Sequence, residues 1–339
     1  MDYVQVAIVG AGPAGSHCAS ELGKMGIYPL IFDPSHPREK PCGGGISPII
    51  LEKFPFIEKF REKGVTFKTF RIISCTGIIG KLNQYKNGFS ISRKYFDNEL
   101  LKIAIKNGAK LKKEKVINIQ KKRNSWNIKT SKGLTTAKIV VGADGVNSIV
   151  RRKTIGPMTK DNLGLTFGYL LSSYEKIQPT IKYLALIPGY IWVFPWENCC
   201  NIGIGSEIKY GGKLRPLLNK FIKNNLAKTT IISKYAAMIP SAKNPNFFDL
   251  PCSGDDWILI GDAAGHVDPI SGGGILYALW GGKMAAKAIK NNQFKKFDKN
   301  WRKAYGDRLK QQCRRKEKFY DPIYSTLSII NSKLKDTKN

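Results

Sequence analysis

A glycine-rich turn near the start of the chain, residues 10–15 (GAGPAG), limits the folds open to this sequence more than any other segment. It lies between an apolar run and a helical pattern. The run Val4 to Val9 has the composition of a buried parallel strand. In such a unit Gly10 permits the tight turn, Gly12 lets the backbone approach a pyrophosphate, and Gly15 lets the helix pack on the strand. The free amides and positive dipole at the start of the helix then favour phosphate binding.

An acid completes this first β-α-β unit. The second strand is expected over residues 28–33, so Asp33 stands at its carboxyl end, where an acidic side chain bonds a ribose hydroxyl of a dinucleotide. A glycine turn alone is a weak signal. Strand, helix and terminal acid in this order predict a dinucleotide-binding domain.

Two later segments repeat the pattern of an apolar run followed by glycine and aspartate. They are residues 142–148 (GADGVNS) and residues 261–266 (GDAAGH). Asp144 and Asp262 could each bond polar groups of a cofactor, and the glycines at 272–274 could bring helix amides against a flavin ring or a pyrophosphate. Taken singly, each segment could be a surface turn.

Together the three segments resemble the FAD-binding signature of the glutathione-reductase-type superfamily, in its aromatic hydroxylase branch, over residues 4–290. The resemblance implies FAD as the cofactor. It also implies a cofactor contact for Arg93, which opens a helix expected over residues 93–107; a solvated helix start is the alternative.

The resemblance implies an α/β fold, α+β overall, in which a Rossmann-like FAD domain is discontinuous in sequence. Aromatic-rich strands over residues 163–204 predict a mostly antiparallel sheet that meets substrate, and helices are expected over 213–228 and 231–237. The predicted segments are 1–65, 93–155 and 250–292 for the FAD-binding domain, 66–92 and 156–249 for the substrate-binding domain, and 293–339 for a short, basic C-terminal helical tail.

Two further segments resemble geranylgeranyl reductases. Residues 41–46 (PCGGGI) resemble their Cys-Gly-Gly-Gly loop, and residues 190–205 resemble their substrate-cavity motif, in which Tyr-x-Trp-x-Phe-Pro is followed after seven residues by Gly-x-Gly. Side chains alternate along a strand, so these aromatic residues could line a long apolar tunnel, although ordinary sheet packing would explain isolated ones. Cys42 is a candidate catalytic residue that tunes the flavin or relays a proton, with a small buried loop residue as the alternative.

The candidate cofactor-binding residues are Gly10, Gly12, Ala14, Gly15, Asp33, Cys42, Gly43, Gly44, Arg93, Asp144, Gly145, Asp262, Gly272, Gly273 and Gly274. The candidate substrate-binding residues are Tyr190, Trp192, Phe194, Pro195, Gly203 and Gly205. No Asp, Glu or His stands out as a dedicated acid.

The resemblance implies an FAD-dependent oxidoreductase that saturates isolated C=C bonds of geranylgeranyl or other polyprenyl chains, in membrane-lipid precursors. Two alternatives stay open: a reductase of the prenyl tail of a quinone or pigment, and an aromatic hydroxylase or halogenase of the same fold. A halogenase would be expected to carry Trp-x-Trp-x-Ile in the first domain, but Trp126 is the first tryptophan. The electron donor stays open between ferredoxin, NAD(P)H and a deazaflavin.

The net charge of the chain indicates which kinds of partner it can attract. The 339 residues carry 56 Lys and Arg against 25 Asp and Glu, a net charge of +31 that attracts polyanions, although an AT-rich genome would raise the Lys content as well. We expect a cytoplasmic protein that associates peripherally with the anionic inner face of the cell membrane. No nucleic-acid partner is expected, because the basic residues are not arrayed with aromatic ones as stacking platforms.

Cysteine and histidine usage predicts no metal. Seven cysteines without a Cys-x-x-Cys pair, and three scattered histidines, indicate neither a disulfide framework nor a zinc site, and favour a reducing compartment. The sequence contains no run of about 18 apolar residues, so we expect no transmembrane helix. The N-terminal residues lack the pattern of a signal peptide.

Overall fold

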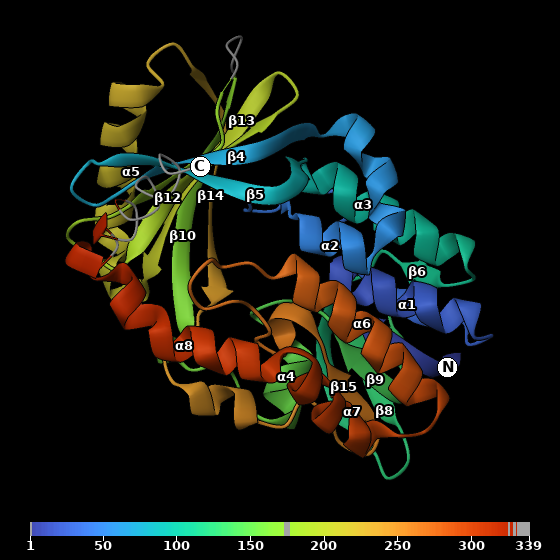
Figure 1. Cartoon of the computed structure of the whole chain (residues 1–339). Coiled ribbons are helices and arrows are strands. Elements are labelled where there is room, and N and C mark those ends of the chain that lie inside the picture. Colours follow the sequence, from blue (N-terminus) through green and yellow to red (C-terminus); the bar gives the residue numbers. More distant parts are fainter. Residues whose placement is uncertain (1, 173–176, 325, 328–329, 331–339) are drawn as a thin grey trace. The chain divides into compact units, whose positions relative to one another are not determined.

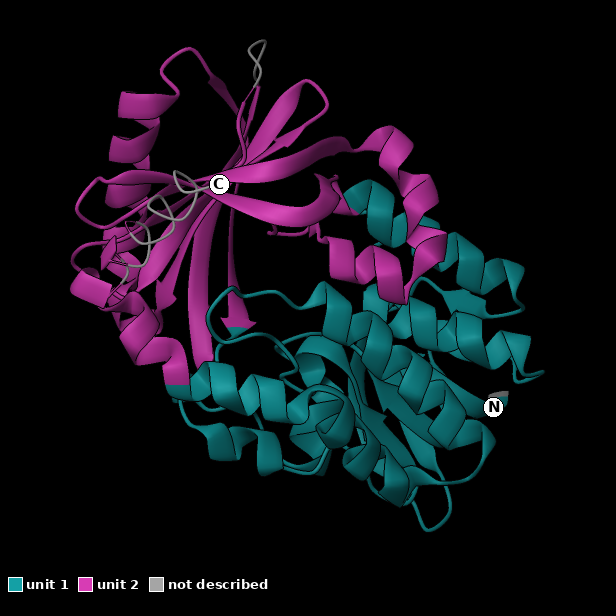
Figure 2. Ribbon diagram, in the orientation of Figure 1, with its two compact units in different colours: residues 1–38, 94–162, 240–314 teal, residues 39–93, 163–239, 315–339 magenta. Residues whose placement is uncertain are grey.

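The first apolar run and the helix after it form β1 (Asp2–Val9) and α1 (Pro13–Lys24). This computed structural model describes residues 2–172, 177–324, 326–327 and 330 (Figure 1). Contacts within the chain divide it into two units (Figure 2). Unit 1 comprises residues 1–38, 94–162 and 240–314, and unit 2 comprises residues 39–93, 163–239 and 315–339.

Unit 1 is built on a sheet with the order β6-β2-β1-β9-β8-β7, in which β15 also pairs with β9. Its parallel pairs join β1 to β2 and β9, β2 to β6, and β9 to β15, whereas β7 and β8 are antiparallel additions. Besides β1 the strands are β2 (Leu30–Phe32), β6 (Lys110–Lys112), β7 (Val116–Lys121), β8 (Trp126–Thr130), β9 (Leu134–Gly142) and β15 (Trp257–Leu259). Strand β1 is apolar throughout its second half because helices cover both faces of a parallel sheet.

Helices complete unit 1. Besides α1 they are α3 (Arg93–Lys106), α4 (Ile149–Thr154), α6 (Ile275–Lys290), α7 (Phe294–Trp301) and α8 (Asp307–Tyr320); a π-helical turn, η6 (Arg302–Gly306), joins the last two, and short 3-10 turns are η2 (Lys160–Asn162), η4 (Pro245–Asp249) and η5 (Gly261–Ala263). Helix α6 lies beside α1 (Figure 1). The two backbones approach closely because a Cβ on Gly282 of α6 would lie 2.6 Å from the carbonyl oxygen of Ala14.

Unit 2 contains a sheet with the order β14-β10-β13-β12-β11-β4-β5-β3. The pairs from β10 through β13 and β12 to β11 and from β4 through β5 to β3 are antiparallel, whereas β11 runs parallel to β4. Its strands are β3 (Gly45–Ile46), β4 (Val65–Ile73), β5 (Ile79–Ser90), β10 (Leu163–Ser172), β11 (Thr180–Tyr183), β12 (Gly189–Trp196), β13 (Cys199–Glu207) and β14 (Thr230–Pro240). Its helical segments are α2 (Pro48–Lys53), η1 (Pro55–Lys63), η3 (Ile208–Tyr210) and α5 (Gly211–Asn225). The antiparallel sheet predicted for residues 163–204 is present.

The core of unit 2 lies between one face of this sheet and α5. Leu214, Leu218 and Phe221 of α5 are buried against a cluster that includes Ile191 and Val193 of β12. Side chains alternate along a strand, so the residues between them, at positions 190, 192 and 194, belong to the opposite face. We call this opposite face of β10, β13 and β12 the aromatic face.

The structure confirms the α/β class with its two sheets and C-terminal helices, and it corrects one expected helix. Residues 231–237 form part of β14, because this β-branched segment pairs with β10 at the edge of the sheet. The boundaries of the two units differ from the boundaries predicted for the domains. Residues 39–65 fall in unit 2, where β3 pairs with β5, and residues 293–314 fall in unit 1, where Phe294, Phe297 and Trp301 of α7 are buried.

The predicted C-terminal tail is helical over α7 and α8, and its residues 331–339 lie outside the described part of the chain. Over the described ranges, no helix combines the length and the apolar character needed to cross a membrane.

Candidate functional site

The three glycine-aspartate segments leave the sheet of unit 1 at one edge. The parallel register pairs Val9 of β1 with Gly142 of β9, and Gly142 with Leu259 of β15. The loops that follow these residues therefore start side by side, at the carboxyl ends of neighbouring parallel strands, where α/β sheets bind ligands. The structure thus brings together the three segments that the sequence assigns to one cofactor.

Close backbone contacts join the three segments. Gly10 has φ of +100°, and a Cβ on it would lie 2.3 Å from the carbonyl oxygen of Ala143. A Cβ on Gly15 would lie 2.0 Å from the carbonyl oxygen of Gly10, and one on Gly261 would lie 3.0 Å from Cβ of Ala14. Side chains at Gly10 and Gly261 would push the segments apart, and a side chain at Gly15 would collide with the turn of its own segment, which explains the residue type at each position.

Gly12 differs from its neighbours because a Cβ on it would meet nothing within 4 Å. It is the N-cap of α1, and no side chain caps this helix end within the described ranges. Open space next to uncapped helix amides is suited to a diphosphate, which the positive end of the helix dipole attracts. The first segment therefore fits the pyrophosphate of FAD.

Asp33 organises the first turn from the end of β2. Its Oδ2 accepts a hydrogen bond from the backbone N–H of Ala11 at 2.8 Å, and its Oδ1 accepts from the backbone N–H and the hydroxyl of Ser35. Burial opposes ionisation of this carboxyl, but the hydrogen bonds from Ser35 and Ala11 outweigh it and hold the pKa of Asp33 below its ordinary value. Asp33 is thus an anion that ties β2 to the glycine turn. Its contact with a ribose stays a prediction.

Asp144 performs a capping role that the sequence did not predict. Its carboxylate accepts hydrogen bonds from the hydroxyl of Ser148 and from the backbone N–H of Ile149, at the start of α4. Burial raises the pKa of Asp144, although these bonds oppose the rise. Gly145, beside it, has φ of +78° and room around its Cα. Both carboxylate oxygens thus serve α4, and cofactor contacts of Asp144 and Gly145 stay predictions.

The third segment is held in place by a loop that follows it. A Cβ on Gly274 would lie 3.3 Å from Oδ1 of Asp262, so the last glycine of the run 272–274 lies next to this aspartate. Asp268 shapes the loop, because its Oδ1 accepts hydrogen bonds from the backbone N–H groups of Ile270 and Ser271. Asp268 was not among the site residues predicted from the sequence, although an aspartate before Pro and Gly is a typical turn signal.

A buried polar cluster holds the far side of the same segment. His266 lies against the ring of Trp301, its Nδ1 is 3.1 Å from the hydroxyl of Tyr305, and its Nε2 is 3.6 Å from Sγ of Cys252. Burial, with a smaller contribution from nearby arginines, lowers the pKa of His266 to about 3, so its imidazole is neutral. Arg151 of α4 donates to the carbonyl oxygen of Ala263 at 3.2 Å. Helix α4 thereby links the second and third segments.

The aromatic motif lies on β12 of unit 2, and its three aromatic residues belong to one face of the sheet. Tyr190 and Phe194 are half-buried, whereas Trp192 is 7% exposed because its indole lies on Gly203 of β13. Gly205 pairs with Tyr190 across the strands. The spacing of seven residues therefore sets the β12–β13 hairpin, in which the two glycines lie opposite two aromatic side chains.

The Cys42 loop packs against this hairpin. Cβ atoms on Gly43 and Gly45 would lie 2.3 and 2.8 Å from ring atoms of Phe194, and the Phe194 ring also contacts Phe67 and Phe70 of β4 edge to face. Trp196 Nε1 donates to the carbonyl oxygen of Gly43 at 3.0 Å, and the backbone N–H of Gly44 lies 3.4 Å from the half-buried Sγ of Cys42. The loop and the aromatic motif, 150 residues apart in sequence, thus form one structure. The carbonyl oxygen of Pro195 accepts from the hydroxyl of Ser90.

Arg93, the remaining candidate, is 3% exposed at the start of α3. Its backbone N–H donates to Oε1 of Glu39 at 2.8 Å, and the hydroxyl of Ser92 donates to Oε2 of the same carboxylate. The Glu39 carboxylate therefore caps this helix, and a cofactor contact of the Arg93 guanidinium stays a prediction.

Glycine-aspartate segments that meet at the carboxyl edge of a Rossmann-type sheet define an FAD-binding flavoprotein, an oxidoreductase class. The family model described as "FAD binding domain" matches residues 3–279. Geranylgeranyl diphosphate reductase of Rhodobacter capsulatus is 32% identical over 83% of this chain and 73% of its own. This chain therefore belongs to the FAD-binding-domain family and, within it, to the geranylgeranyl reductases.

Further comparisons agree. Digeranylgeranylglycerophospholipid reductase 1 of Methanococcoides burtonii is 28% identical over 99% of this chain and 88% of its own. The crystal structure of a geranylgeranyl bacteriochlorophyll reductase-like protein from Thermoplasma acidophilum superposes with a TM-score of 0.83 at 26% identity, over 94% of this chain and 88% of that one. A flavin-dependent brominase, with a TM-score of 0.74 at 21% identity over 99% of this chain and 92% of that one, shares the fold alone.

Proposed function

We propose that this protein uses FAD to saturate isolated C=C bonds of geranylgeranyl chains in membrane-lipid precursors. The observation that carries the proposal is the aromatic face of unit 2, where the Trp192 ring lies on Gly203 and beside the ring of Tyr190, and the Phe194 ring packs against the glycines of the Cys42 loop. Such a surface offers a flexible prenyl chain apolar contact, with few polar groups to desolvate. The names of the relatives support the same substrate class.

The chemistry needs a strong reductant and a dry apolar surface. Bound FAD in its reduced form supplies a hydride equivalent. An isolated alkene accepts hydride poorly, so a proton must reach one alkene carbon before or during the transfer, and the other carbon then carries positive charge. The faces of Tyr190, Trp192 and Phe194 attract a cation, and their apolar surroundings exclude water that would trap it.

Cys42 is the residue of the Cys-Gly-Gly-Gly loop whose side chain carries a proton that can be transferred. We propose that its thiol tunes the flavin or relays the proton. Cys42 is half-buried and next in sequence to Gly43, which packs against the Phe194 ring, and this place near the aromatic face supports either role.

The deciding experiment is anaerobic turnover. Purified FAD-loaded protein is reduced with dithionite and incubated with a geranylgeranyl phospholipid precursor, and the products are analysed by mass spectrometry. Products heavier by whole hydrogen pairs support the proposal, and unchanged lipid contradicts it. A parallel reaction with a prenylated quinone tests the quinone-tail alternative. A reaction with an aromatic substrate, NAD(P)H and oxygen tests the hydroxylase alternative.

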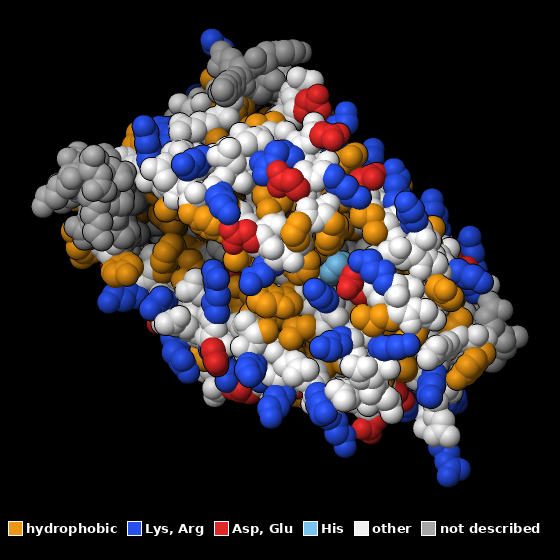
Figure 3. Space-filling model, turned by 45° about the vertical axis from the view of Figure 1, so that its right-hand side comes forward, with side chains coloured by type: hydrophobic (Ala, Val, Ile, Leu, Met, Phe, Trp, Pro, Cys, Tyr) orange, Lys and Arg blue, Asp and Glu red, His pale blue; other side chains and the backbone are white. Residues whose placement is uncertain are grey.

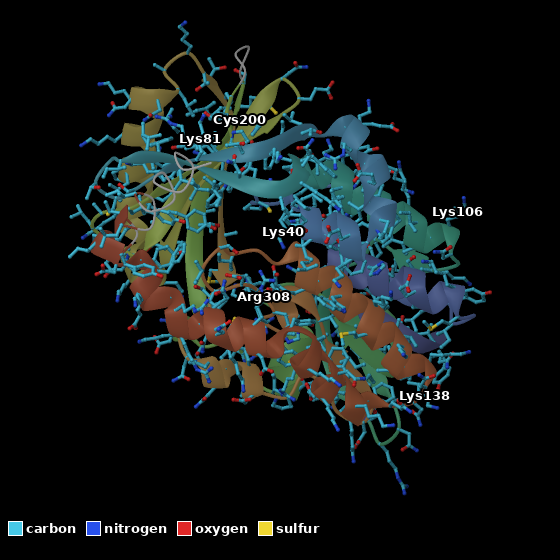
Figure 4. The ribbon with its side chains drawn as sticks, in the orientation of Figure 1. Lys40, Lys81, Lys106, Lys138, Cys200 and Arg308 are labelled. Carbon is cyan, nitrogen blue, oxygen red and sulfur yellow. The ribbon has the colours of Figure 1, made fainter. Side chains whose placement is uncertain are left out.

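We also propose that the protein collects its substrate at an anionic membrane surface. Lysine and arginine are spread over the visible face of the molecule (Figure 3), and those labelled in Figure 4 come from several strands, helices and loops. Helix α8 adds exposed basic residues, and the exposed apolar side chains of Ile323 and Leu327 follow it. Each basic residue near such a membrane contributes about 1 kcal/mol.

Sedimentation with liposomes tests this association. Binding to vesicles that contain anionic lipid, released by high salt and absent with neutral vesicles, is expected. Equal recovery in the supernatant with both vesicle types would contradict it. The electron donor is addressed in the same preparation by asking whether reduced ferredoxin, NAD(P)H or a reduced deazaflavin replaces dithionite.

A further inference from the structure

A strip of glycines crosses the aromatic face of unit 2. Gly168 of β10 pairs with Gly203 of β13, which in turn pairs with Trp192 of β12. A Cβ on Gly203 would lie 2.1 Å from Cζ2 of Trp192, and a Cβ on Gly168 would lie 2.4 Å from the hydroxyl oxygen of Tyr235 on β14. Rings from the strands on either side, β12 and β14, therefore lie over the strip, in space that any larger side chain would fill.

The polar atoms of these two rings meet at one buried amide. Trp192 Nε1 donates to Oδ1 of Asn201 at 2.9 Å, and the hydroxyl of Tyr235 donates to the same oxygen at 2.7 Å. An indole N–H can only donate, so the amide must turn its oxygen rather than its nitrogen toward Trp192. Asn201 pairs with Phe194 across the hairpin, which places the amide within the aromatic motif.

This arrangement carries a cost in stability. Asn201 is 1% exposed, and its Nδ2 has no hydrogen-bond partner within the part of the chain that the structure describes. A buried donor without a partner costs about 1–3 kcal/mol. A leucine would avoid this cost but would leave the indole N–H of Trp192 without its acceptor, and the Tyr235 hydroxyl with only the carbonyl oxygen of Ile202, 3.2 Å away. The fold thus tolerates one unsatisfied donor and keeps both rings hydrogen-bonded to one oxygen.

We propose that Asn201 and Tyr235 are positioning residues for alkene reduction, which hold Trp192 over the glycine strip and keep the aromatic face free of water. This inference rests on the proposed function. Burial raises the pKa of Tyr235, so its hydroxyl stays protonated and remains a donor to the amide. With both donors satisfied inside the protein, no water is required beside Trp192.

The chemistry shows why dryness matters. In the reduction the alkene π bond is replaced by two C–H bonds, one to a proton and one to the hydride that brings both electrons from the reduced flavin. Between these events the second carbon is electron-deficient. Water at that moment would form a C–O bond, lose a proton and leave an alcohol instead of the saturated chain. An aromatic face without bound water leaves the hydride as the only nucleophile that the intermediate can meet.

Asn201→Leu is the principal test, because it keeps the number of side-chain heavy atoms and removes the acceptor. In the anaerobic reaction with a geranylgeranyl phospholipid precursor we expect kcat to fall about tenfold, FAD affinity to stay unchanged, and part of the product to be heavier by one water. Tyr235→Phe keeps the ring and removes the hydroxyl, so a smaller loss of the same kind is expected. Asn224→Leu, the same exchange at an exposed position of α5, is the matched control and should behave like the wild type.

The double variant tests whether the two residues act together. If Asn201 acts through Tyr235, the combined loss in kcat is smaller than the product of the single losses. If the wild-type protein reduces no prenyl lipid, the proposed function itself is contradicted. Active wild type with Tyr235→Phe at the same rate and with no hydrated product overturns the positioning role, and this holds even where Asn201→Leu does not fold.

Discussion

Gly203→Ala should displace the Trp192 indole without disturbing the hairpin that carries it. The new Cβ would lie 2.1 Å from Cζ2 of Trp192 and 2.6 Å from Cε2 and Cη2. Carbon atoms pack at about 3.5–4.0 Å, so the ring must move by about 1 Å or more. A shift of that size breaks the hydrogen bond of 2.9 Å between Trp192 Nε1 and Asn201 Oδ1.

The magnitude follows from two contributions. Overpacking of a buried site costs about 1–3 kcal/mol. The lost hydrogen bond adds about 0.5–1.5 kcal/mol. The total is about 1.5–4.5 kcal/mol. With an unfolding entropy of about 2.1 cal/mol/K per residue over the 339 residues, the midpoint of thermal unfolding should fall by about 2–6 °C if the chain unfolds as a whole.

Gly205→Ala is the matched control on the same strand and the same face. A Cβ there would lie 3.5 Å from Thr166 and 3.7 Å from Trp192, which is ordinary contact. Its midpoint should therefore stay within about 1 °C of the wild type, or rise, since Gly→Ala lowers the entropy of the unfolded chain. Circular dichroism at a peptide band follows unfolding, and near-ultraviolet circular dichroism reports the tryptophan environment.

The two variants separate packing from a general intolerance of the strand to alanine. A midpoint for Gly203→Ala equal to that of the wild type, or equal losses for both variants, would refute the packing of Trp192 on Gly203. In turnover assays Gly203→Ala should also lower kcat, because the ring leaves its position on the aromatic face.

Lowering the pH from about 6.5 toward 4 should reduce thermal stability, because the unfolded chain takes up protons at His17 and His266 near 6.5, whereas burial lowers their pKa in the fold to about 4 and about 3. His266→Gln should flatten this decline in thermal unfolding, and an unchanged slope would contradict the argument. Gly15→Ala, which places a Cβ 2.0 Å from the carbonyl oxygen of Gly10, should weaken FAD binding about tenfold or more in a fluorescence titration; unchanged affinity would speak against that contact. Cys42→Ser should lower anaerobic turnover with FAD still bound, and full turnover would remove Cys42 from the reaction.

Local backbone requirements were readable from the sequence alone. The glycine turn at residues 10–15 predicts a tight turn and a close helix, and Gly10 does adopt φ of +100° against Ala143. Alternation along residues 190–196 correctly predicts which side chains of β12 share a face, because the period of a strand is a local property. The two glycine-aspartate segments could likewise be assigned to strand ends, since each follows an apolar run.

Tertiary pairing decided what local pattern could not. The segment 231–237 reads as a helix in isolation, yet it forms β14 because β10 offers an unpaired edge. Asp33 stands where a cofactor ligand is typical, yet its carboxylate also accepts from the backbone N–H of Ala11, which lies 22 residues earlier and which only the fold brings within reach. Asp144 is likewise bonded by a backbone N–H, but that of Ile149 is local to the start of α4.

Asn201 shows the boundary between the two kinds of information. Nothing in its surroundings, Cys-Cys-Asn-Ile, distinguishes it from a surface asparagine. Its place opposite Phe194 follows from the hairpin register, and its second partner, Tyr235, arrives on a strand that begins about thirty residues later. The glycine turns and the aromatic alternation follow from the order of residues, because they depend on neighbours along the chain. Which polar atoms are buried together follows from the pairing of strands that are far apart in the sequence, and no local pattern specifies it.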